Sequence, residues 1–141
     1  MIESISGIAA AIGLIVLYQV LSKSFELKLL AATTLVAIAF IYVGFSLKDN
    51  PVGAIILETG FALALYFLTI IGYKRNNLLL AFGIIAHGLW DIFHHNNLFI
   101  GTDIPGYWPS FCFIIDIVDG IYFLIVLKNQ KQQSALRPIV K

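Results

Sequence analysis

Charged residues are scarce in this chain of 141 residues: Asp, Glu, Lys and Arg make up only 12% of it, about half their share in a soluble domain. The single cysteine, Cys112, excludes an intramolecular disulfide. The net charge of +1 gives no basic face of the kind that nucleic-acid binding requires. What remains is 60% hydrophobic, a composition that favours a membrane over water as the solvent.

Five apolar segments follow one another, each about as long as a bilayer core requires. They cover residues 4–21, 27–46, 52–73, 78–95 and 108–127. The first begins beside Glu3 and not beside basic residues, so we interpret it as a retained helix and not as a cleaved signal peptide. The sequence therefore predicts an all-α membrane bundle of about five transmembrane helices. We expect one domain over residues 1–127 and a mobile basic tail over 128–141.

Basic residues are divided unequally between the two sides of such a bundle. One side receives only Lys48, and the other receives Lys23, Lys28, Lys74, Arg75, Lys128, Lys131, Arg137 and Lys141. Cytoplasmic loops retain Lys and Arg, so this division predicts an amino terminus outside the cell and a carboxyl-terminal tail in the cytoplasm. It also favours an odd number of spans.

Ionisable residues inside the predicted spans are the second unusual feature. Four of the eight acidic residues lie there, namely Glu58, Asp91, Asp116 and Asp119. All three histidines lie in the fourth span: His87, His94 and His95. Each such residue costs about 2.5–3.5 kcal/mol on insertion. With about 1.5 Å of rise per residue, the acids and His87 fall roughly 8–17 Å from the outer ends of their helices, which predicts one polar layer in the outer half of the bilayer.

The spacing of these residues suggests metal binding. At about 100° per residue, His87, Asp91 and His94 fall within roughly 60° of one another on one helix face. Imidazole and carboxylate groups together suit Zn, Fe or Mn. We therefore predict a divalent metal, Zn or Fe, held by a set of five ligands: His87, Asp91, His94, His95 and Asp116. The remaining acids, Asp119 and Glu58, are the candidate general bases.

This pattern favours a membrane-embedded metalloenzyme that takes a lipophilic substrate from the outer leaflet, with hydrolysis favoured over oxidation because the histidines are few. Two alternatives stay open. One is a transporter or channel for protons or cations, and the other is a non-enzymatic subunit whose polar layer joins the helices. We interpret Cys112 first as a packing residue, and Trp90 either as a wall of the site or as facing lipid. A bundle this thin also favours a homo-oligomer.

The last third of the chain resembles a family of small bacterial membrane proteins known as domain of unknown function 6010. The likeness covers a helix reading His-x-x-Trp-Asp-x-x-His-His, a proline-containing loop and a segment ending in Cys and Asp. The shared residues are His87, Trp90, Asp91, His94, His95, Cys112 and Asp116. Glu58 and Asp119 lie outside the likeness, and Ile117 stands where the family has proline. The resemblance implies that these residues act together in a bacterial membrane, for which we expect the inner membrane, but it names no reaction.

Overall fold

The computed structural model describes residues 2–48, 51–95 and 102–136, and all of its helices and turns fall within these ranges. Its helices are α1 (Ile2–Leu21), α2 (Leu27–Ala39), α3 (Ile41–Ser46), α4 (Val52–Arg75), α5 (Leu78–His94) and α6 (Trp108–Leu136). The prediction of an all-α fold is confirmed. The last five residues, with Arg137 and Lys141 of the predicted tail, lie outside the described residues.

Among the described residues, four helical segments are long and apolar enough to cross a membrane. They are Ser4–Leu21, Leu27–Ser46, Val52–Arg75 and Trp108–Gln133. The remaining apolar helix, α5, is shorter at 17 residues. These features indicate an integral membrane protein, and the predicted fourth span, residues 78–95, corresponds to the short α5.

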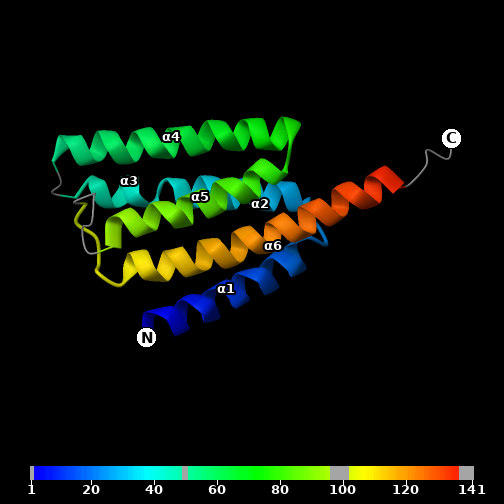
Figure 1. The fold of residues 1–141 in the computed structure, drawn as a ribbon, viewed down its shortest axis with the longest axis horizontal. Coiled ribbons are helices and arrows are strands. Elements are labelled where there is room, and N and C mark those ends of the chain that lie inside the picture. The colour runs from blue at the N-terminus through cyan, green and yellow to red at the C-terminus, as the bar shows by residue number, and fades with distance from the viewer. Residues whose placement is uncertain (1, 49–50, 96–101, 137–141) are drawn as a thin grey trace.

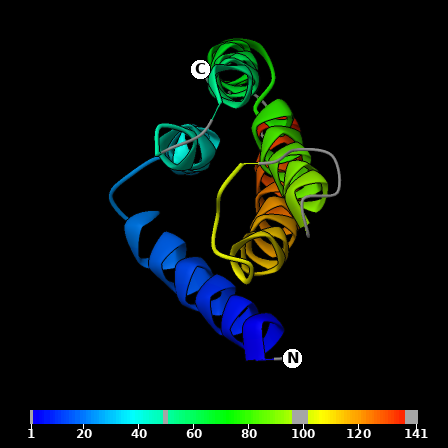
Figure 2. The same ribbon diagram turned by 90° about the vertical axis from the view of Figure 1, so that its left-hand side faces the viewer.

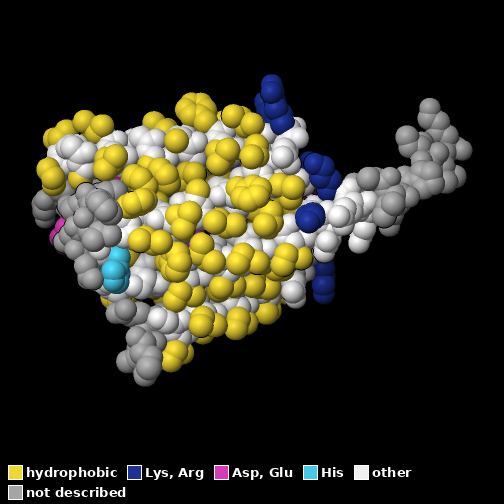
Figure 3. All heavy atoms as spheres, in the orientation of Figure 1, with side chains coloured by type: hydrophobic (Ala, Val, Ile, Leu, Met, Phe, Trp, Pro, Cys, Tyr) yellow, Lys and Arg dark blue, Asp and Glu magenta, His cyan; other side chains and the backbone are white. Residues whose placement is uncertain are grey.

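Helix α5 contacts α2, α4 and α6 (Figure 1), and lies between α4 and α6 in Figure 2. Helix α1 packs against α6, away from α4. Large apolar side chains such as Ile5, Ile12 and Phe67 are exposed on the outer helices, as Figure 3 shows for one face. Lipid can cover such side chains, whereas the ionisable residues of α5 are surrounded by other helices.

Two glycines allow α5 and α6 to approach closely. A Cβ added at Gly120 would lie 2.5 Å from Ile85 Cγ1 and 3.2 Å from the backbone nitrogen of Ile85. A Cβ at Gly88 would lie 3.0 Å from Cβ of Asp116. Without side chains at these positions the two backbones come together, and this brings α5 within reach of the acids on α6.

The predicted second span contains a break. Helix α2 ends at Ala39, Phe40 has φ −96° and ψ 0°, and α3 begins at Ile41. Beyond the break, Tyr42 is fully buried and points toward α5, where its hydroxyl reaches Asp91. The break at Phe40 therefore lies within one helical turn of Tyr42, the residue that contacts Asp91.

Helix α6 continues past the predicted end of its span at residue 127 and reaches Leu136. The polar residues from Lys128 onward end the apolar stretch, but Lys and Gln are good helix formers and the helix does not stop there. Basic side chains gather at this end of the molecule (Figure 3). The first part of the predicted tail is thus a helical extension of α6.

Candidate metal centre

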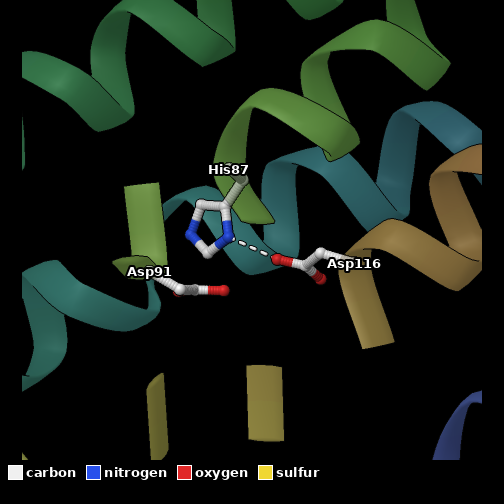
Figure 4. A group of neighbouring side chains, drawn as sticks. All are labelled: His87, Asp91 and Asp116. Atoms are coloured by element: carbon white, nitrogen blue, oxygen red, sulfur yellow. Dashed lines mark hydrogen bonds and ion pairs between the residues drawn. The ribbon is translucent and has the colours of Figure 1, made fainter. Parts of the chain in front are cut away.

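His87 and Asp91 of α5 lie beside Asp116 of α6 in the interior of the bundle (Figure 4). One nitrogen or carboxylate oxygen from each residue lies within 4.8 Å of the other two. All three side chains are buried. We call this set the metal group, because a buried set of His and Asp at such separations could hold a metal ion.

The spacing along α5 explains half of this arrangement. His87 and Asp91 are four residues apart and so lie one above the other on a single helix face. Asp116 comes from the neighbouring helix at the level where Gly88 lets α6 approach. The sequence periodicity thus positions two members, and the packing of α5 on α6 adds the third.

The hydrogen bond between His87 and Asp116 defines which His87 nitrogen is available. Nδ1 of His87 lies 2.6 Å from Oδ2 of Asp116, and in this bond Nδ1–H donates to the carboxylate. The other ring nitrogen, Nε2, is buried and has no hydrogen-bond partner among the described residues. A carboxylate on one imidazole nitrogen orients the ring and makes the opposite nitrogen a better metal ligand.

Asp91 has the same combination of one bonded and one unpaired atom. Tyr42 donates its hydroxyl to Oδ1 at 2.6 Å, whereas Oδ2 is buried without a partner in the described part of the chain. A buried polar atom without a partner costs about 1–3 kcal/mol. The metal group therefore contains two unpaired atoms that are both good ligands for a cation, His87 Nε2 and Asp91 Oδ2.

The structure places Glu58 and His94 in a separate set of contacts. Oε1 of Glu58 lies 2.6 Å from His94 Nε2 and accepts a 2.7 Å bond from Thr102, while Oε2 accepts a 3.1 Å bond from Trp90 Nε1. His94 Nδ1 lies 3.1 Å from the carbonyl oxygen of Trp90, which can only accept. We call these four residues the Glu58 network. Both nitrogens of His94 are engaged within it.

This geometry defines a hydrogen-bonded pair. Since His94 Nδ1 faces a carbonyl and donates to it, the proton between His94 Nε2 and Glu58 Oε1 joins the two side chains. The carboxyl group of Glu58 accepts two further hydrogen bonds, so both of its oxygens have partners. Trp90 also stacks on Phe61 with ring centroids 3.9 Å apart, so it forms a wall of this network.

His95 and Asp119 also lie apart from the metal group. His95 is exposed, and its Nδ1 lies 3.2 Å from the hydroxyl of Ser110. Asp119 is buried and accepts a 3.2 Å bond from Tyr18, whose hydroxyl in turn accepts a bond from Thr34. Oδ1 of Asp119 has no partner among the described residues. Of the predicted ligands, the structure brings together His87, Asp91 and Asp116. The roles given to His94, His95, Asp119 and Glu58 stay predictions.

Sequence reasoning missed Tyr42 and Thr102, each of which bonds directly to one of the acids. For Tyr42 a signal was present, because it lies four residues from the outer end of its predicted span at residue 46, roughly 6 Å deep and close to the depth of the shallowest acids. Thr102 lies in the connector before α6, for which no helical depth could be counted. Cys112 is buried and belongs to neither set, as expected of a packing residue.

A cavity of about 460 Å³ adjoins the metal group. We call it the lateral cavity. Its walls come from the start of α1, the end of α5 and the start of α6, and Asp91 forms part of them together with His95 and Ser110. The remaining walls are mainly apolar, including Ile92, Phe113 and Ile114. It therefore offers an apolar space that ends at a metal-group carboxylate.

Comparison of the chain with protein-family models, with curated proteins and with solved structures found no match. Its likeness to domain of unknown function 6010 stays a prediction, and evidence for a function comes from the residues of the site alone.

Proposed function

We propose that this protein is a membrane-embedded, metal-dependent enzyme, with hydrolysis favoured over oxidation, and that the metal group holds a Zn or Fe ion. The observation that carries the proposal is the pair of buried, unpaired ligand atoms, His87 Nε2 and Asp91 Oδ2, in a group that fits within 4.8 Å. A dication supplies both atoms with a partner and offsets carboxylate charge that hydrocarbon cannot solvate.

The number of ligands supports a catalytic role over a purely structural one. Structural zinc sites are closed by four protein ligands, whereas catalytic sites use three and leave a position for water or substrate. The metal group offers fewer than four ligands, because His87 and Asp91 have the unpaired ligand atoms and Asp116 holds the His87 ring. A metal bound there supplies Lewis-acid chemistry, polarising an ester or amide carbonyl. One imidazole in the group is few for a di-iron oxidase, so hydrolysis is the better fit.

The remaining predicted residues take different parts in this proposal. Tyr42 fixes the carboxylate of Asp91, and Asp116 fixes the ring of His87. Asp119 is our candidate general base, because its Oδ1 receives no described hydrogen bond. Glu58 already accepts bonds from three donors, so we assign Glu58 and His94 to holding α4 against α5.

The lateral cavity supports a lipophilic substrate. Its walls are mainly apolar and it lies at the end of the molecule where α1 begins and α5 ends. We propose that this end faces outward, with the carboxyl terminus in the cytoplasm of a bacterium and the bundle in its inner membrane. A substrate from the outer leaflet then enters between α1, α5 and α6, with its polar group toward Asp91.

Metal analysis of the full-length protein in detergent tests the proposal. We expect wild type to carry Zn or Fe in stoichiometric amount, and His87→Ala and Asp91→Ala to lose most of it. Asp103→Ala, a change of the same kind at an exposed residue, serves as the control and keeps the metal. Hydrolysis of long-chain fluorogenic esters and amides should follow the metal content. A folded wild type that stays free of metal after incubation with Zn²⁺ and Fe²⁺ would leave the polar layer with a structural role and refute the proposal.

A further inference from the structure

A second cavity, of about 430 Å³, lies at the end of the molecule away from the metal group. We call it the basic cavity. Three separate parts of the chain line it: the start of α2, the end of α4 with its turn into α5, and the extension of α6. Its cationic residues are Lys28, Lys74, Arg75 and Lys131. No Asp or Glu is among its described lining residues.

Lys28, which lines this cavity, has an acidic neighbour in Glu26. Glu26 lies 3.1 Å from the Lys28 ammonium, but both side chains are well exposed, and such pairs are weak. The same ammonium lies 4.9 Å from the centroid of the Tyr73 ring, a contact that orients the lysine without neutralising it. Glu26 therefore offsets little of the Lys28 charge, and the charged residues among the described lining of the basic cavity are all cationic.

The general preference for basic residues in cytoplasmic loops explains why cations occur at this end. The helix dipole likewise favours Lys74 and Arg75 in the last turn of α4. Neither effect explains why these cations line one cavity. Lys131 lines it together with the end of α4 because α6 stays helical beyond residue 127. Cations from three segments of the chain line one cavity, and a bound anion would offset their mutual repulsion.

The donors around the basic cavity suit a phosphate group. Arg75 offers the planar guanidinium that binds phosphate oxygens in pairs, and the lysines add mobile ammonium groups. Asn76 and Asn77 also line the cavity and carry amide donors. Its volume is within the range of small-molecule sites. Tyr73 at the rim is a residue typical of the boundary between hydrocarbon and headgroups.

From this convergence we propose that the basic cavity binds the phosphate headgroup of an anionic phospholipid. The α2 and α4 spans end at the cavity, so a phosphate held there belongs at the membrane surface, with its acyl chains beside the apolar helices. Basic pockets between helices recognise anionic headgroups in this manner. This site is independent of the metal group.

Binding of soluble short-chain lipids to the full-length protein in neutral detergent tests this site. The probes are dioctanoyl phosphatidylglycerol, dioctanoyl phosphatidylcholine and inorganic phosphate. We expect phosphatidylglycerol to bind wild type most tightly, and Arg75→Gln with Lys131→Gln to weaken it about tenfold or more. Lys23→Gln with Lys128→Gln removes the same charge from residues outside the cavity lining, and should change the affinity less than about twofold.

A neutral variant separates a site from a general charge effect. Asn77→Ala leaves every charge in place and should still weaken phosphatidylglycerol binding several-fold, with the protein remaining monodisperse by size exclusion. Equal binding of the two lipids, or equal losses in the two double variants, would overturn the proposal. Inorganic phosphate that displaces phosphatidylglycerol at equal concentration would overturn the lipid as the ligand.

Discussion

Tyr42 donates a 2.6 Å hydrogen bond to Oδ1 of Asp91, and its ring stacks on His94 with centroids 4.2 Å apart. One side chain from α3 thus contacts both the metal group and the Glu58 network. The hydroxyl fixes the carboxylate, while the ring fills the space between α5 and α3. Tyr42 therefore links the broken second span to Asp91, one of the proposed metal ligands.

Tyr42→Phe should weaken metal binding while keeping the fold. The change removes the hydroxyl that orients Asp91 but leaves the ring on His94. Loss of such an outer partner costs about 10–100-fold in metal affinity. Competition against a chelator of known affinity measures the effect. Tyr66→Phe, an exposed position on α4, is the matched control and should bind metal like wild type. Equal affinities in wild type and Tyr42→Phe would contradict the role given to the hydroxyl.

Removal of the metal should destabilise the protein. Without a cation, His87 Nε2 and Asp91 Oδ2 are buried and unpaired, whereas a ligand that binds only the folded state stabilises it by about 2.7 kcal/mol at a hundred times its dissociation constant. We expect a chelator to lower the melting temperature of wild type in detergent, and added Zn²⁺ to restore it. Asp91→Ala should respond to neither addition. A wild-type melting temperature that changes with neither the chelator nor Zn²⁺ would contradict a metal in this group.

Glu58→Ala should reduce stability more than metal content. It leaves His94 Nε2 buried without its partner, and a buried polar atom left unpaired costs about 1–3 kcal/mol. The metal group shares no described hydrogen bond with Glu58, so the folded fraction should keep its metal. Denaturation in detergent and metal analysis of the same sample give the two readings. The double change with His94→Ala should cost less than the sum of the single changes, because the two residues form one pair. Metal loss from folded Glu58→Ala would return His94 to the set of ligands.

The helices could be predicted closely from the apolar runs, because a bilayer fixes their length and water-soluble connectors separate them. The depth count also grouped the acids and histidines in one layer. It could not separate the metal group from the Glu58 network, since depth along a helix does not indicate which neighbouring helix a side chain contacts. His87 and His94 lie on one face of α5, yet His87 meets Asp116 and His94 meets Glu58. That division depends on how α4 and α6 pack on either side of α5.

Gly120→Ala should separate α5 from α6 and disturb the metal group. The added methyl would lie 2.5 Å from Ile85 Cγ1 and 3.2 Å from a backbone nitrogen, and the backbone cannot move aside as a flexible side chain can. Overpacking of this kind costs about 1–3 kcal/mol. The melting temperature and the metal affinity should both fall. Gly13→Ala is the control, since nothing lies within 4 Å of a Cβ there. Equal stability of the two variants would show that α5 and α6 tolerate a wider spacing.

The orientation of the bundle can be read from the two ends of α6. The candidate span Trp108–Gln133 holds 26 residues, or about 39 Å of helix, so its two ends lie on opposite sides of a hydrocarbon core of about 30 Å. In a Cys112→Ala background, a cysteine at Tyr107 should react with a membrane-impermeant maleimide in intact cells, and one at Gln133 should react only in inverted vesicles. Both positions are exposed, and the buried Cys112 of wild type should stay unlabelled in either preparation. Labelling of the Gln133 position in intact cells would reverse the orientation, and it would place the basic cavity outside the cell and the lateral cavity in the cytoplasmic leaflet.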